Sequence, residues 1–164
     1  CFEVLLDLRI SEKTDADCNR KKAEKEETDT HRLKGLRFLC AEDNELNAEI
    51  LKELLHMEGA DCVICPNGRS VVDTFEQSVP GDYDMILMDV QMPVMNGYEA
   101  TKAIRKGKHP LARTIPIIAM TANAFSEDVQ KSLSAGMNAH ISKPMDMKKL
   151  ARVVKKERIK FGLK

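Results

Sequence analysis

The sequence has 164 residues, of which 43% are hydrophobic and 32% are charged, which is enough apolar material for one packed domain. Its 26 Lys and Arg residues balance its 26 Asp and Glu residues, so the chain lacks the positive excess that binding to nucleic acid or to a membrane surface needs. The longest apolar runs hold about seven residues, far short of the ~18 that a membrane-spanning helix requires.

The first 34 residues divide into two segments of different character. Residues 1–10 alternate enough to predict one short β-strand. Residues 11–34 contain 14 charged residues and a single branched aliphatic residue, Leu33, so they cannot bury enough apolar surface to offset the entropy of ordering. We interpret 11–34 as a charged, flexible linker. A solvated helix from Asp17 to Thr28 is the alternative.

From Gly35 onward, short apolar runs alternate with segments of helical spacing. The apolar runs are 36–41, 62–65, 85–90, 115–120 and 139–142, and the helical segments are approximately 46–57, 68–78, 97–107, 125–135 and 146–159. Strands that alternate with helices pair in parallel, and continuous apolar runs are typical of strands buried on both faces. The sequence therefore predicts an α/β fold with a doubly wound, five-stranded parallel sheet.

The chain has five cysteines, two of which, Cys62 and Cys65, have the CxxC spacing of redox pairs and of zinc half-sites. No second CxxC or His pair is placed to complete a zinc site, and both residues lie in an apolar run that predicts a strand. We therefore interpret them as reduced residues of the core. Redox or zinc chemistry is the alternative.

Polar side chains stand at the carboxyl ends of four predicted strands. The first strand ends in Glu42 and Asp43, the third in Asp89, the fourth in Thr121 and the fifth in Lys143. The carboxyl ends of parallel strands lie at one edge of the sheet, where functional groups gather. We therefore expect these side chains to converge.

This set of side chains suits a phosphoryl group better than a metal alone. Three carboxylates forced together repel, and a hard divalent cation with oxygen ligands, Mg²⁺, removes that conflict. A phosphoryl group bonded to a carboxylate also needs an ammonium and a hydroxyl, because its oxygens are shared among Mg²⁺, Lys143 and Thr121. A carboxylate can be the nucleophile, and Asp89 is the candidate because its strand is central in this topology.

Four motifs, in this order, resemble the receiver (response-regulator) domain of two-component phosphorelays. They are AEDN at 41–44, MDVQMPVMNG at 88–97, MTA at 120–122 and SKP at 142–144, and the resemblance covers about residues 35–160. It implies a (βα)₅ flavodoxin-like receiver fold. It also implies a phosphoacceptor domain that takes a phosphoryl group from a phosphohistidine onto Asp89, with Mg²⁺ as cofactor, and relays the signal.

The resemblance implies a set of metal ligands. Asp43 and Asp89 contact Mg²⁺ directly, Glu42 acts through a water, and the backbone carbonyl of Gln91 supplies another oxygen. All of these are oxygen donors, as Mg²⁺ prefers.

It also implies the residues that handle the phosphoryl group. Thr121 moves toward that group on activation, and Lys143 pairs with it, aimed by a cis bond to Pro144. Pro93 and Gly97 shape the loop after the phosphorylation site.

One position, His140, departs from the common pattern of the family. Many members have an aromatic residue three positions before the lysine, and its rotamer follows the threonine. A histidine there either swings or responds to pH near ~6.5, or is a partly exposed strand residue. The coupling to Thr121 is therefore open.

Residues 1–10 look like the final strand of a histidine-kinase ATP-binding domain, which with the linker indicates the C-terminal receiver of a hybrid sensor histidine kinase. The chain shows no ATP-lid glycine motif and no phosphoacceptor histidine motif. The expected donor is therefore a sensor histidine kinase domain, and the expected acceptor is a histidine phosphotransfer protein or domain. We expect a cytoplasmic location, no nucleic-acid partner and no direct membrane contact.

Two other functions stay open. A phosphatase with an aspartyl nucleophile in a similar fold needs a second acid two residues after the nucleophile, where this chain has Gln91. A degenerate receiver that only binds partners is the other, and the intact set of site residues argues against it. The basic stretch 143–164 is interpreted as a solvated helix face with a frayed tail, with a docking surface for an acidic partner or nucleic acid as the alternative.

Overall fold

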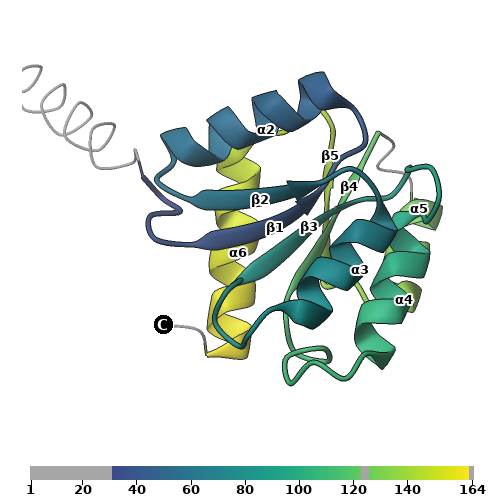
Figure 1. Cartoon of the computed structure of the whole chain (residues 1–164). Helices are drawn as coiled ribbons and strands as arrows, with labels where there is room; N and C mark the ends of the chain where they lie inside the picture. Colours follow the sequence, from purple (N-terminus) through teal and green to yellow (C-terminus); the bar gives the residue numbers. More distant parts are fainter. Residues whose placement is uncertain (1–30, 123–125, 163–164) are drawn as a thin grey trace, which may run out of the picture. The chain divides into compact units, whose positions relative to one another are not determined.

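The computed structural model describes residues 31–122 and 126–162 (Figure 1). The predicted strand 1–10, most of the predicted linker with its alternative helix, and Asn123 lie outside the described residues. Residues His31–Lys164 form one compact unit.

Five strands alternate with five helices along this unit. In chain order they are β1 (Arg37–Ala41), α2 (Glu45–Met57), β2 (Asp61–Cys65), α3 (Gly68–Gln77), β3 (Met85–Asp89), α4 (Gly97–Lys106), β4 (Ile117–Thr121), α5 (Ser126–Ala135), β5 (Ala139–Ser142) and α6 (Met147–Phe161). The strands pair in parallel in the order β2-β1-β3-β4-β5. The predicted fold class is confirmed. None of the described helices has the length and apolar content to cross a membrane.

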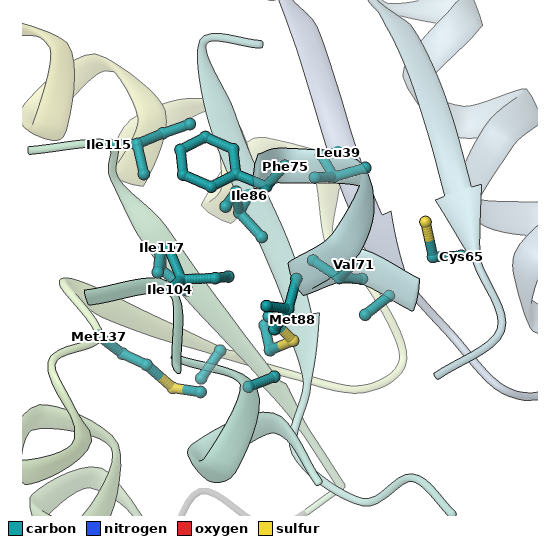
Figure 2. Packing of buried hydrophobic residues seen from close by; sticks show 14 of the residues in the cluster. Leu39, Cys65, Val71, Phe75, Ile86, Met88, Ile104, Ile115, Ile117 and Met137 are labelled. Carbon is teal, nitrogen blue, oxygen red and sulfur yellow. The ribbon is translucent and has the colours of Figure 1, made fainter. Parts of the chain in front are cut away.

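The sheet lies between helices α3 and α4 on one face and α2 and α6 on the other (Figure 1). It separates two apolar cores. On one face, Val71 and Phe75 of α3 and Ile104 of α4 pack against Ile86 and Met88 of β3, as Figure 2 shows. On the other face, α2 and α6 cover the sheet through Leu51, Leu55, Leu150 and Val154. The central strands β3 and β4 are buried along their whole length, which explains why they are continuous apolar runs in the sequence.

Three loops at the carboxyl edge of the sheet are fixed by asparagine caps. The side chains of Asn44, Asn67 and Asn96 accept a hydrogen bond from the third residue of α2, α3 and α4 respectively. Such a cap satisfies an amide that has no partner within the helix. Asn96 and Glu99 form a reciprocal capping box, so the helix that follows Asp89 begins at a defined residue.

Most boundaries lie within one or two residues of the prediction, and two of the differences have a clear physical cause. The fourth strand begins at Ile117 rather than at 115, because Pro116 has no N–H for the ladder; its carbonyl accepts from the Ile86 amide at 2.9 Å. At the start, residues 31–34 belong to the folded unit rather than to the linker. Leu33 is 1% exposed, and its amide donates to the Glu58 carbonyl at 3.1 Å. One buried leucine therefore extends the fold into a charged segment.

Candidate functional site

Three carboxylates lie together at the carboxyl edge. Glu42 and Asp43 follow β1 and Asp89 ends β3; one oxygen from each lies within 4.8 Å of the others. The parallel register that pairs Ala41 with Met88 brings these strand ends side by side. Glu42 and Asp89 are each 4% exposed, while Asp43 is exposed. The structure thus groups the three predicted acids.

Lys143 reaches into this cluster from the end of β5. Its Nζ donates to Glu42 Oε2 at 2.6 Å and to Asp89 Oδ2 at 2.8 Å. The Lys143 amide donates to the Thr121 carbonyl at 2.8 Å, which ties the end of β5 to the end of β4. The Lys143–Pro144 bond is cis, as predicted.

The electrostatics of the cluster favour an added cation. Burial raises the pKa of Asp89 despite the opposing hydrogen bonds from Lys143 and from the Gln91 amide. Burial alone would lower the pKa of Lys143, but Asp89 and Glu42 raise it, so the ammonium stays charged. Three carboxylates therefore share one positive charge, and one of them resists ionisation.

The hydrogen bonds show which of the three acids has carboxylate oxygens available for a ligand. Glu42 is occupied: Oε2 accepts from Lys143, and Oε1 accepts from the Asn44 amide and from Asn47 Nδ2, both at 3.3 Å. Asp43 makes no hydrogen bond or ion pair with any described residue. The donor set fits Mg²⁺, because carboxylate oxygens are hard donors of the kind that this ion prefers and those of Asp43 are available. Both Asp89 oxygens also accept, Oδ1 from the Gln91 amide at 3.1 Å and Oδ2 from Lys143, so of the three acids Asp43 alone offers oxygens without a hydrogen bond to a described residue.

The other predicted residues lie around the same place. Gln91 and Thr121 line, with Asp43, an open cavity of about 500 Å³, and Pro93 lies on its wall. Thr121 is buried at the end of β4. Gly97 packs so closely that an added Cβ would collide with the Asp89 carbonyl oxygen. The loop after Asp89 therefore needs glycine at its end for a steric reason.

His140 lies on β5 opposite Ala119, on the sheet face that also carries Thr121. It is half-buried. Its position matches the predicted one, and its switching role stays a prediction.

Sequence reasoning missed several residues of the site. Asn47 Nδ2 donates to Glu42 Oε1. The sequence contained a signal for this contact, because an amide side chain three residues after a helix N-cap points back toward the cap. Tyr98, Asp128 and Lys131 line the cavity from α4 and α5. Nothing in the sequence distinguished them from ordinary surface side chains.

The fold and the site together define a class of protein. The strand order is the flavodoxin-like 2-1-3-4-5 order, in which ligands bind outside the carboxyl ends of the strands. An acidic cluster with one lysine lies at that edge, so the class is a flavodoxin-like α/β protein with a charged site at the carboxyl edge of its sheet.

Comparisons with known proteins agree with this class. Residues 38–155 match the response regulator receiver domain family, and the chain belongs to that family. It is 39% identical over 127 residues to hybrid signal transduction histidine kinase I of Dictyostelium discoideum, covering 76% of this chain and 7% of that protein. It is 37% identical over 121 residues to the sensor protein GacS of Pseudomonas syringae, covering 73% and 13% respectively. The chain thus spans a small part of these relatives.

Solved structures are similar over the folded unit. The receiver domain of a sensor histidine kinase from Pseudomonas aeruginosa, solved with magnesium in its active-site cleft, matches with a TM-score of 0.66 and 36% identity; the match covers 74% of this chain and 96% of that one. The receiver domain of Ssk1 from Saccharomyces cerevisiae, solved with the histidine phosphotransfer protein Ypd1, matches with a TM-score of 0.63 and 28% identity, covering 73% and 86%. This chain is a receiver domain of two-component signalling, homologous to those of hybrid kinases.

Proposed function

We propose that this receiver domain accepts a phosphoryl group from a phosphohistidine onto Asp89, with Mg²⁺ bound between Asp43 and Asp89. One observation carries the proposal. A nearly buried carboxylate at the end of the central strand has a lysine 2.8 Å away and two further acids within reach. A structural ion pair would not need the exposed Asp43 beside it, which has no partner within 31–122 and 126–162.

The chemistry follows from where the side-chain atoms lie. An Asp89 oxygen attacks phosphorus, the new O–P bond forms as the N–P bond of the phosphohistidine breaks, and the released imidazole nitrogen keeps the electron pair. A bound Mg²⁺ supplies positive charge for the transferring oxygens. Lys143 supplies an ammonium on the other side of Asp89, and Thr121 supplies a hydroxyl from β4. Both groups stabilise the transferred oxygens.

The rim of the site offers a surface for the donor. Leu46 and Ile50, on the first turns of α2, are 65% and 50% exposed. This helix begins shortly after Glu42 and Asp43 in the sequence. Val94, at the tip of the loop after Asp89, is 85% exposed. Apolar groups displayed around a polar site are typical of a docking surface. We propose that they contact the helical domain that presents the phosphohistidine.

We propose the same partners that the sequence suggested. The donor is a sensor histidine kinase domain, and the acceptor is a histidine phosphotransfer protein or domain. The similarity to the Ssk1 receiver, solved with such a protein, supports this choice. The similarity to hybrid kinases supports a hybrid parent. We also propose that the receiver works in the cytosol beside the kinase domain.

A transfer experiment tests the proposal. A phosphotransfer protein labelled with ³²P on its histidine is mixed with the chain and Mg²⁺, and the label on each protein is followed. We expect label to move to the wild type and to Asp84→Asn but not to Asp89→Asn, because Asp84 lies at the opposite edge of the sheet, where it accepts from the Arg37 amide. Equal transfer to Asp89→Asn would refute the assignment.

A further inference from the structure

The acid that directly follows β1 is held by the start of α2. Glu42 Oε1 accepts from the Asn44 amide and from Asn47 Nδ2, both at 3.3 Å. Asn44 is the N-cap of α2, and its side-chain oxygen accepts from the Asn47 amide at 3.0 Å. Glu42, Asn44 and Asn47 therefore form a closed ring of hydrogen bonds. Glu42 is 4% exposed, so few water molecules reach its carboxylate to replace these donors.

This ring differs from the capping box at the start of α4. There the third helical residue, Glu99, accepts from the amide of the N-cap Asn96, and Asn96 accepts from the Glu99 amide. In α2 the third helical residue is Asn47, and the acid that accepts from the N-cap amide is Glu42. The side chain at position 47 thus donates a hydrogen bond where a capping box needs an acceptor.

The cap of α2 does not depend on the side chain of Asn47. The cap uses the main-chain N–H of this residue, which any residue except proline would supply. The side chain itself is exposed on the first turn, where asparagine has a lower helix propensity than glutamate or glutamine. Helix formation therefore gives no reason for asparagine at position 47, whereas its contact with Glu42 does.

Glu42 in turn holds the ammonium of Lys143. Lys143 follows β5 and Glu42 follows β1, and the ends of β3 and β4 lie between them in the sheet. The Lys143 side chain points across these strand ends, and its Nζ meets Glu42 Oε2 at 2.6 Å and Asp89 Oδ2 at 2.8 Å. The flexible stem of a lysine does not fix its ammonium. The contact with Glu42, the more distant strand end, therefore keeps this ammonium beside Asp89.

We propose that Asn47 is a positioning residue for phosphoryl transfer, which acts through Glu42 on Lys143. This inference rests on the proposed function of Asp89. With the Asn47 donor in place, one oxygen of Glu42 is fixed and the other faces the ammonium, which then lies where the transferred oxygens arrive. Without that donor the Glu42 carboxylate can rotate, and Lys143 loses its fixed partner.

The first test observes Lys143 directly, without a phosphodonor. Nitrogen NMR spectra of the lysine ammonium groups are recorded in EDTA, and the Lys143 signal is assigned with Lys143→Arg. An ammonium held by two carboxylates exchanges its protons slowly enough to be seen. We expect the signal in the wild type and in Asn47→Gln, which keeps an amide donor, and its loss in Asn47→Leu. A signal that persists in Asn47→Leu, or that the wild type lacks, would overturn the proposal.

The second test compares stability with rate. Asn47→Glu allows a capping box with Asn44, so this variant should unfold at the same or a higher urea concentration than the wild type. It should nevertheless be labelled by acetyl phosphate at saturating Mg²⁺ several-fold more slowly, because the new acid takes the Asn44 amide and repels Glu42. Asn47→Leu should be slowed by up to about tenfold, the size of one hydrogen bond to a charged group. Asn47→Gln should recover part of the rate.

A control on the same helix separates this inference from the proposed function. His56→Leu, at an exposed position on the last turn of α2, should change neither the labelling rate nor the Lys143 signal. Equal labelling rates in the wild type, Asn47→Leu and Asn47→Glu would overturn the role of Asn47 and leave phosphorylation of Asp89 intact. A wild type that shows the Lys143 signal but takes no label at Asp89 would overturn the proposed function and, with it, the role of Asn47 in transfer.

Discussion

The two edges of the sheet use polar side chains in opposite ways. At the carboxyl edge, Glu42 and Asp89 share the ammonium of Lys143, and Asp43 lies beside them with no ion pair to a described residue. At the amino edge, polar side chains bind main-chain groups instead. Arg37 Nη2 donates to the Gly81 carbonyl at 2.7 Å.

The amino edge is held by a half-buried cation and a buried histidine. Arg105 donates to the carbonyls of Ala112 and Gly136 at 2.8 and 3.0 Å, and to Asn138 Oδ1 at 2.9 Å. His109 is 8% exposed; its Nε2 lies 3.1 Å from the Ser78 carbonyl oxygen. These bonds close loops, whereas the acids across the sheet repel one another. The side chains at the amino edge stabilise the fold, whereas those at the carboxyl edge repel one another in a way that a bound cation would relieve.

Backbone conformation follows the same division. Gly81 and Gly136, in loops of the amino edge, occupy positive φ, which glycine adopts without strain. At the carboxyl edge, Val94 has a φ of 69° in the tight turn that follows Pro93. A β-branched residue there is strained. His31, with a φ of 80°, is the other described non-glycine residue at positive φ and lies beside the amino edge, but Val94 is β-branched, so the larger backbone cost lies at the functional edge.

The largest expected effect separates two aspartates that lie at the two ends of β3. Asp89→Asn should abolish phosphorylation by a small phosphodonor with Mg²⁺ and leave the fold intact. Asp84→Asn should keep phosphorylation, because an amide oxygen can still accept from the Arg37 amide. Phosphate-affinity electrophoresis measures both. Loss of labelling in Asp84→Asn with an unchanged circular dichroism spectrum would break the comparison of the two edges.

Removing Asp43 should separate metal binding from stability. Because the three acids repel, Asp43→Ala should unfold at the same or a higher urea concentration than wild type in EDTA. Wild type should gain about 2.7 kcal/mol in Mg²⁺ at a hundred times its dissociation constant, and the variant should gain almost nothing. Urea unfolding with and without Mg²⁺ measures this, and an equal Mg²⁺ gain in both proteins would contradict the assigned site.

A substitution at the amino edge should lower stability and leave phosphorylation unchanged. Arg105→Met removes three hydrogen bonds from a charged donor and should lower the free energy of unfolding by about 2 kcal/mol. The rate of phosphorylation should not change at temperatures where the variant is folded. Arg69→Met is the control, since its ion pair with Asp73 is exposed and contributes at most about 0.5 kcal/mol.

A substitution in the proposed docking surface, formed by Leu46, Ile50 and Val94, should have a smaller effect, on the rate of phosphoryl transfer. Ile50→Arg should slow transfer from a phosphohistidine protein about tenfold, equivalent to about 1.4 kcal/mol, through the loss of apolar contact. Ile159→Arg, a substitution at the far end of α6 where the isoleucine is 75% exposed, should not. Neither variant should change labelling by acetyl phosphate. Equal slowing of transfer by both variants would show that this surface does not contact the donor.

The smallest effect concerns the strained turn. Val94→Asn should raise the free energy of unfolding by up to about 1 kcal/mol, because asparagine tolerates positive φ better than valine and the side chain is 85% exposed. Val79→Asn, at a position that is 62% exposed on the amino edge and not at positive φ, should be nearly neutral. Thermal unfolding of the pair measures the difference, and a destabilised Val94→Asn would show that the turn is not strained.

The sequence predicted the fold and most of the site because both depend on local patterns. Buried parallel strands are continuous apolar runs, and the residues after them must meet at one edge. Asp89 and Lys143, which lie 54 positions apart in the chain, could therefore be predicted to meet. What the sequence did not reveal depends on long-range contacts. The burial of Leu33 follows from the end of α2, and the partners of Arg105 lie on two separate segments, at Ala112 and at 136–138. No window of sequence contains that information.

The most direct test of the central claim is to locate the phosphoryl group itself. The chain is incubated with acetyl phosphate and Mg²⁺ and reduced with borohydride, which converts an aspartyl-phosphate to homoserine, and its peptides are sequenced by mass spectrometry. The account predicts homoserine at position 89 alone, dependent on Mg²⁺ and absent in Asp89→Asn. Homoserine at position 43, or at position 89 to the same extent in EDTA, would contradict it.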